Sequence, residues 1–244
     1  MMCAIARGQT AAEPLVFDAA VMRQDKSGAN GFWYDESPSG LFSVRNITLS
    51  NLFQDAFHVR RDAMIGAPGW FDSERFDVSG KAPPGTTDEK FMLMTQSLLM
   101  EQFRMRVHRE QRVQEAFVLT AGKGGPKMRK SEGKDEPDCD RVRALPNEYG
   151  GQHFACTNMN MAGLVEKLGT DVGRGYIDRT VLDRTGLTGR YDFRLSFTPF
   201  RSIDQGGITI FGALEQVGLK LEEKKAPLPV VVIDHVERFV PELE

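Results

Sequence analysis

The sequence contains no run of roughly 18 apolar residues, so it predicts no transmembrane helix. It also lacks an excess of positive charge, because 31 Lys and Arg residues stand against 34 Asp and Glu residues, a net charge of −3. Proteins that bind nucleic acid usually present a basic surface to the phosphate backbone. We therefore expect neither a membrane span nor a nucleic-acid partner.

The motifs of common enzyme and cofactor classes are also absent. There is no Gly-x-Ser-x-Gly elbow for a nucleophilic serine and no His-Glu-x-x-His helix for a metal hydrolase. The glycine-rich stretch from Gly122 to Gly125 lacks the spacing of a phosphate-binding loop, and a turn at the end of a strand explains it better. No cofactor and no metal site are predicted.

Cysteine is scarce: three residues occur, with neither a CxxC pair nor a Cys/His metal spacing. Residues 1–14 are interpreted as the remnant of an export signal or as a disordered N-terminus, because Thr10-Ala11-Ala12 resembles a signal-peptidase site. If Cys3 leaves with such a signal, Cys139 and Cys156 remain as an even pair. They are a possible disulfide in an oxidising compartment, and the predicted location is periplasmic or secreted.

What is present is an internal repeat within a chain of 244 residues, 41% of them apolar, enough to bury a core. Phe42–Leu52 aligns with Phe154–Leu164 at an offset of 112 residues (154 − 42), and Arg75–Val78 with Arg190–Phe193 at an offset of 115 (190 − 75). We therefore predict an α+β fold of two diverged copies of a strand-helix-strand-strand-helix-hairpin unit, related by a pseudo-twofold axis.

The repeat divides the chain into parts. Residues 15–121 are the first α+β copy and residues 153–240 the second. Residues 122–152 between them are rich in Gly, Pro and charges of both signs, which is typical of a solvated connector.

Apolar residues at helical spacing predict the first helix of each copy. Thr48 and Asn160 are the expected N-caps. The apolar stripes behind them are Leu49, Leu52, Phe53, Ala56 and Phe57 in the first copy, and Met161, Leu164, Val165, Leu168 and Val172 in the second. A second helix is expected in each copy, behind a capping box of Thr86 and Glu89 and behind Thr209 respectively.

Each second helix is expected to run into a hairpin. The alternating segment Phe103–His108 would return through Ala116–Ala121, and Leu219–Glu222 through Val230–His235. Because Val230–Ile233 is continuously apolar, it is predicted to be a central strand covered on both faces.

Five separated segments resemble one protein family. They are Pro68–Asp77, Val107–Glu110, Lys123–Lys127, Leu182–Phe193 and Val232–Glu237. In this order they are similar to the heavily paralogous, uncharacterised protein family of soil acidobacteria, over roughly Val16 to Glu237. The resemblance implies an exported protein with no assigned activity. A weaker likeness, on topology alone, is to the small periplasmic domains of secretins and TonB-dependent receptors.

Four polar residues are the candidates for an active site. Asp77 and Asp192 occupy equivalent positions in the two copies and could form a paired-carboxylate site, or each could fix a turn through the Arg two residues before it. His108 and His235 lie within motifs, but no nucleophile or second acid is evident beside either. Gathering of these residues in one pocket would indicate a hydrolase, and their dispersal would favour binding.

Three aromatic residues are the candidates for a binding surface. Trp33 and Tyr34 lie in a Gly- and Ser-rich segment, from which a ring could stack on a sugar or peptide. Trp70 lies in a Pro-Gly turn, where anchoring of the core is the alternative. We expect a non-catalytic exported module that binds a protein, peptide or glycan, with an open strand edge near Trp33 as the contact. The alternative is a hydrolase with a site built from scattered Asp and His residues.

Overall fold

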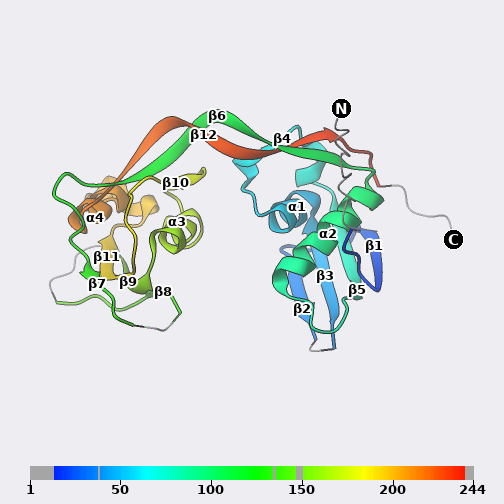
Figure 1. The fold of residues 1–244 in the computed structure, drawn as a ribbon, viewed down its shortest axis with the longest axis horizontal. Helices are drawn as coiled ribbons and strands as arrows, with labels where there is room; N and C mark the ends of the chain where they lie inside the picture. Colours follow the sequence, from blue (N-terminus) through cyan, green and yellow to red (C-terminus); the bar gives the residue numbers. More distant parts are fainter. Residues whose placement is uncertain (1–13, 38, 134–135, 147–150, 240–244) are drawn as a thin grey trace, which may run out of the picture. The chain divides into compact units, whose positions relative to one another are not determined.

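The structure is a computed structural model that describes residues 14–37, 39–133, 136–146 and 151–239 (Figure 1). All but the last residue of the predicted signal remnant, 1–14, therefore lie outside the described residues. Within the described ranges no helix is long and apolar enough to cross a membrane.

The fold is α+β, as predicted, with twelve strands in three sheets in the described part of the chain. The chain splits into two compact units. Unit 1 comprises residues 1–110 and 230–244, and unit 2 comprises residues 111–229. Each unit buries a hydrophobic core of its own.

Unit 1 is built on a four-stranded antiparallel sheet in the order β1-β5-β3-β2. Its strands are β1 (Ala19–Asp25), β2 (Trp33–Glu36), β3 (Leu41–Thr48) and β5 (Arg75–Lys81); the other elements are α1 (Leu49–Phe57), η1 (Arg61–Ala63), β4 (Met64–Ile65), η2 (Gly69–Asp72) and α2 (Asp88–Gln102). The two helices pack against one another and share a core with the alternate residues of the strands, so they cover one face of the sheet (Figure 1).

Each helix of unit 1 begins behind a threonine whose hydroxyl caps it. The predicted stripe of α1 is buried, and the Thr48 hydroxyl accepts a hydrogen bond from the amide of Asn51 at 3.2 Å, which confirms the predicted N-cap. The predicted capping box of α2 is wrong by one residue: Thr87 caps the helix by accepting from the amide of Lys90, while Thr86 donates its hydroxyl to the carbonyl of Pro83.

Unit 2 has a second four-stranded antiparallel sheet, in the order β7-β11-β9-β8. Its strands are β7 (Arg129–Lys130), β8 (Asp138–Arg141), β9 (Gln152–Met159) and β11 (Tyr191–Phe197); the other elements are α3 (Met161–Gly169), β10 (Val181–Asp183), η3 (Phe200–Gln205) and α4 (Ile210–Gln216). Asn160 caps α3 and Thr209 caps α4, both as predicted. The internal duplication and its pseudo-twofold axis stay predictions from the sequence.

The predicted hairpins are instead two long single strands, β6 (Arg106–Ala121) and β12 (Leu219–His235), each with residues in both units. The segment between His108 and Ala116 contains no Gly, Pro, Asn or Asp, so no residue there favours a turn. In unit 1, β12 pairs with β4 through Val231 and Val232, and Val230–Ile233 is buried throughout, as expected for a central strand.

The predicted division of the chain also differs from the compact units. Residues 122–152 contain two short strands, because β7 pairs with β11 and β8 pairs with β9. The end of the predicted second copy, from residue 230, belongs to unit 1, and the end of the predicted first copy, from residue 111, belongs to unit 2. Both differences arise from pairing between strands distant in sequence, which periodicity does not report.

Candidate functional site

The candidate site is built around a bulge in β3 of unit 1. The register with β5 shifts between Val44 and Ile47, and Asn46 has a φ of 56°. Asn tolerates this left-handed conformation better than most residues. Its backbone is held from β5, since the amide donates to Asp77 Oδ1 at 2.9 Å and the carbonyl accepts from Arg75 Nη1 at 2.7 Å.

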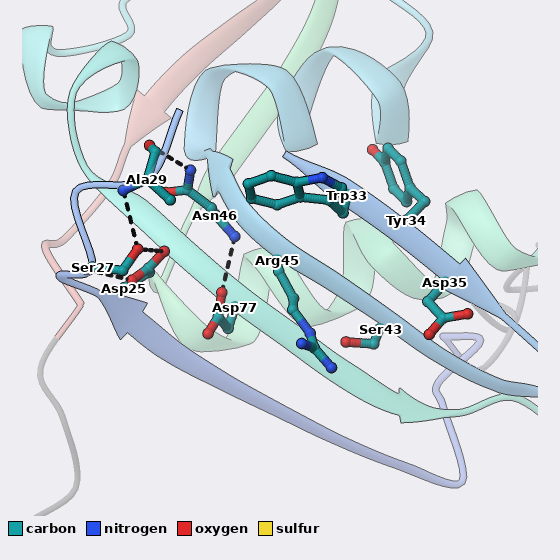
Figure 2. Close-up of a pocket in the computed structure, with 10 residues that line it drawn as sticks. All are labelled: Asp25, Ser27, Ala29, Trp33, Tyr34, Asp35, Ser43, Arg45, Asn46 and Asp77. Carbon is teal, nitrogen blue, oxygen red and sulfur yellow. Dashed lines mark hydrogen bonds between the residues drawn. The ribbon is translucent and has the colours of Figure 1, made fainter. Parts of the chain in front are cut away.

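The side chain of Asn46 holds the loop that leads into β2. Asn46 is 1% exposed, and its Nδ2 donates to the carbonyl of Ala29 at 2.8 Å (Figure 2). The same Nδ2 also donates to the carbonyl of Gly31. Because both acceptors precede β2 directly, one buried amide fixes the path by which the chain enters that strand.

β2 is the edge strand of its sheet and carries the exposed aromatic residues. Within the described part of the chain it pairs with β3 alone, at the end of the order β1-β5-β3-β2. Trp33 is 54% exposed and Tyr34 is 48% exposed. Two of the three predicted binding residues, Trp33 and Tyr34, therefore lie on an open strand edge.

The hydrogen-bonding groups of this edge follow from the register. The amide of Ser37 donates to the carbonyl of Leu41, so Ser37 faces β3. Successive residues of an antiparallel strand alternate between facing the partner and facing away. The amides and carbonyls of Tyr34 and Glu36 consequently point outward from the sheet.

A pocket of ≈ 630 Å³ lies beside β2 on the face of the sheet opposite the helices. Trp33 and Arg45 are cross-strand partners at its wall, and Asp35, Asp77 and Asn46 also line it (Figure 2). The pocket combines an aromatic ring with one guanidinium and several carboxylates, which suits recognition of a polar or charged group.

Tyr34 also lines this pocket, but its hydroxyl reaches α1 on the other face of the sheet. Its hydroxyl donates to Asp55 Oδ2 on α1 at 2.5 Å, and its ring packs edge-on against Phe32 at 5.5 Å between centroids. Burial of the hydroxyl, and then the hydrogen bond to Asp55, raise the pKa of Tyr34 well above its usual range. The hydrogen bond from Tyr34 to Asp55 ties β2 to α1.

Trp70 is placed differently from Trp33 and Tyr34. It is half-buried in η2 and packs against the core of unit 1, with ring centroids 4.9 Å from Phe71 and 6.1 Å from Phe103. The guanidinium of Arg238 lies 5.9 Å from its ring centroid. Trp70 thus has the environment of a core anchor rather than that of an open binding residue.

The two candidate aspartates lie in separate pockets. Asp192 lines a pocket of ≈ 560 Å³ in unit 2, where its Oδ1 accepts from the amide of Asn158 at 2.8 Å and its Oδ2 contacts Arg129 at 2.7 Å. The hydrogen bond from the Asn158 amide contributes most to lowering the pKa of Asp192. Each aspartate holds a bulge, whereas the sequence suggested that each binds the Arg two residues before it.

The two candidate histidines are engaged elsewhere on exposed strands. His108 contacts Asp234 Oδ2 through Nδ1 at 2.8 Å, and His235 contacts Glu237 Oε1 through Nε2 at 3.2 Å. Neither lines the pocket of Asp77 or the pocket of Asp192. The structure does not bring the four polar candidates together in one pocket.

We expect the ion pair of His108 with Asp234 to make the stability of unit 1 depend on pH. The hydrogen bond to Asp234 contributes most to raising the pKa of His108. A raised folded-state pKa contributes stability below the unfolded pKa of about 6.5, and this stability is lost as the pH rises through the folded pKa. We expect urea unfolding to show a decline in stability across this range that His108→Gln reduces and that high salt weakens. An unchanged slope in the variant would contradict this assignment.

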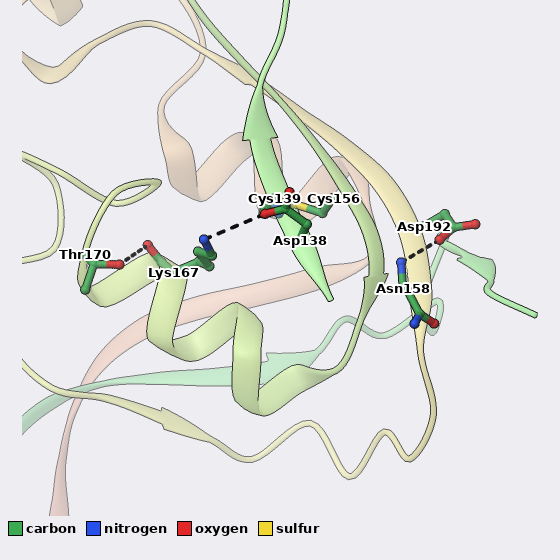
Figure 3. Close-up of a disulfide and its surroundings, with 7 residues drawn as sticks. All are labelled: Asp138, Cys139, Cys156, Asn158, Lys167, Thr170 and Asp192. Carbon is green, nitrogen blue, oxygen red and sulfur yellow. Dashed lines mark hydrogen bonds and ion pairs between the residues drawn. A yellow bond between two sulfur atoms is a disulfide. The ribbon is translucent and has the colours of Figure 1, made fainter. Parts of the chain in front are cut away.

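Unit 2 repeats the bulge and fastens its edge strand covalently. Asn158 has a φ of 50°, and its carbonyl accepts from Arg190 Nη1 at 3.3 Å. The edge strand β8 is joined to β9 by a disulfide between Cys139 and Cys156 (Figure 3). In unit 1 the corresponding pair, Tyr34 and Val44, has no covalent link.

Each edge strand also contacts the first helix of its unit, although the contacting residues on the two strands are not at matching positions. Lys167 of α3 lies 3.9 Å from Asp138 of β8, and Lys167 follows Asp55 by the same 112 residues (167 − 55) by which Cys156 follows Val44 (156 − 44). Asn46 and Asn158 were not predicted as structural residues, although the alignment at this offset places one over the other.

The described residues contain no group of three or more His, Cys, Asp or Glu side chains that could hold a metal ion. A family model described as "Protein of unknown function (DUF3738)" matches residues 50–236. No curated protein and no solved structure matches the chain.

Proposed function

The chain belongs to the DUF3738 family of proteins of unknown function, and we propose that it is a non-catalytic binding module that captures an extended segment of another protein at the edge of β2. The observation that carries the proposal is the outward direction of the amides and carbonyls of Tyr34 and Glu36 on an edge strand. An extended peptide can add to such an edge as a further strand, with no catalytic residue and no cofactor.

Preorganisation of this edge supports the proposal. Asn46 fixes the loop before β2, and the Tyr34–Asp55 hydrogen bond ties the strand to α1. An edge that is already ordered loses less conformational entropy when a peptide binds. Trp33, on the other face, can cover a side chain of the added strand.

We also propose that the protein is exported. An acidobacterial origin and membership of a group of paralogues are proposed with it, because the resemblance implies both. The Cys139–Cys156 disulfide supports the periplasm or the outside of the cell, because disulfides persist in oxidising compartments. The hydrolase alternative has less support, since Asp77, Asp192, His108 and His235 do not share a pocket with one another.

Replacing Trp33 and Tyr34 together by Ala is expected to abolish capture of peptides selected from a displayed library against the wild-type chain. The double variant loses the ring beside the pocket and the link to α1. Trp33→Ala alone should weaken capture while thermal unfolding stays nearly unchanged, because its side chain is mostly exposed. Phe200→Ala in unit 2 is the matched control, since Phe200 is also 54% exposed.

The strand-addition mode has its own test in Glu36→Pro. Proline removes the outward amide of Glu36 without touching a hydrogen bond to β3. We expect the variant to fold, as judged by circular dichroism, and to lose peptide affinity about tenfold, which is about 1.4 kcal/mol. Full affinity in Glu36→Pro would show that the outward backbone groups of the edge are not used. In the preceding experiment, unfolding of Trp33→Ala would show that the ring of Trp33 belongs to the core.

A further inference from the structure

We infer that the β2 edge selects extended segments that carry Lys or Arg side chains, an inference that rests on the function proposed above. Asp35 and Glu36 are adjacent on β2, so their side chains point to opposite faces of the sheet. A peptide strand added to β2 would also alternate its side chains between these faces. Each face therefore offers a carboxylate to the incoming segment.

The pockets on the two faces are both acidic. Among the described residues, the pocket beside Trp33 is lined by the carboxylates of Asp25, Asp35 and Asp77, with Arg45 as the only Lys or Arg. A second pocket, of ≈ 850 Å³, is lined by the carboxylates of Glu36, Asp88 and Glu89, with no Lys or Arg among the described residues at its wall. The excess of carboxylates extends along β2 from one pocket to the other.

These pockets also offer apolar surface for the stem of a long cationic side chain. Trp33 presents a ring on one face, to which an ammonium or guanidinium is attracted. On the other face Leu41, Phe91 and Met92 line the pocket that contains Glu36. Lys and Arg cover apolar surface with their methylene stems while the charged group stays in water, so both pockets suit them.

The pocket beside the bulge of unit 2 differs in charge from the pockets beside β2. It contains Arg129 and Lys130 as well as Glu132 and Asp192, so its charges balance. The edge strand β8 of unit 2 is joined to β9 by the Cys139–Cys156 disulfide. The acidic lining is thus a property of the unit 1 edge and not of the bulge arrangement that both units share.

The test uses capped synthetic peptides in which Val alternates with Lys, Gln or Glu. We expect the Lys peptide to bind the full chain about tenfold more tightly than the Gln peptide at low ionic strength, the Glu peptide to bind most weakly, and the preference to shrink with salt. In Asp35→Asn/Glu36→Gln the Lys peptide should lose this advantage while the Gln peptide keeps its affinity. The control is Glu132→Gln/Asp140→Asn in unit 2, which changes one carboxylate of the pocket beside the bulge and one of the edge strand β8, and it should keep the wild-type order.

The outcomes separate this inference from the proposed function. Equal binding of the Lys and Gln peptides, with both lost in Trp33→Ala/Tyr34→Ala, overturns the charge preference and leaves the edge function standing. If the Lys peptide still binds more tightly than the Gln peptide in Asp35→Asn/Glu36→Gln, the carboxylates of Asp35 and Glu36 are not the cause of the preference, and the inference is overturned. Binding of no peptide, or binding that ignores Trp33→Ala/Tyr34→Ala, overturns the function and the inference together.

Discussion

Asn46→Asp is expected to destabilise unit 1 by about 3 kcal/mol and to abolish peptide capture, although it changes a single atom type. The amide nitrogen of Asn46 donates to the carbonyls of Ala29 and Gly31. An oxygen in its place would face two acceptors, and the new carboxylate would be almost fully buried near Asp77. A buried charge without a donor is costly to keep, so the loop before β2 should detach.

Two further variants separate the side chain from the backbone. Asn46→Gly keeps the positive φ without strain and loses only the side-chain bonds, about 1 kcal/mol in total. Asn46→Ala adds roughly 1 kcal/mol for a left-handed residue with a Cβ. Urea unfolding should therefore rank the variants Gly, Ala, Asp in order of increasing damage. If Asp proved as mild as Gly, the two carbonyl contacts would not be what holds the loop.

Loss of the Cys139–Cys156 disulfide is expected to destabilise the protein by about 3 kcal/mol, from the entropy of closing a loop of this size. The two cysteines are 17 residues apart and join the edge strand β8 to β9. Cys139→Ser/Cys156→Ser should show this loss by urea unfolding, and reduction of the wild type should match it. Peptide capture at β2 should persist where the chain stays folded, because the bridge lies in unit 2.

Cys3→Ser is the matched control, because it removes a thiol and leaves the Cys139–Cys156 bridge intact. Thiol counting on protein purified without reductant should find no reactive thiol at Cys139 or Cys156, in the wild type and in Cys3→Ser alike. Reactive thiols at both Cys139 and Cys156 would refute the bridge. A stable double variant with the bridge confirmed in the wild type would show instead that β8 is held by its backbone pairing and by Lys167.

The candidate site was predictable in part. An exposed aromatic segment at Trp33 and Tyr34, ahead of a strand, could be read from its Gly- and Ser-rich surroundings. The carboxylate of Asp77 was recognised by its equivalence with Asp192, but its partner was assigned to Arg75 when it is the backbone of Asn46. That partner lies on another strand, and spacing along one strand carries no information about it.

The sequence by itself determined the α+β class, the N-cap and buried stripe of α1 and the central apolar strand at Val230–Ile233, because these depend on neighbours within a few residues. Only the tertiary structure decided that β6 and β12 are single long strands, that β7 and β8 join a sheet, and that β2 is left at an edge. The contacts responsible, such as Asn46 with Asp77 and Tyr34 with Asp55, join residues distant in sequence. They form only when several strands and a helix pack together, so no local pattern records them.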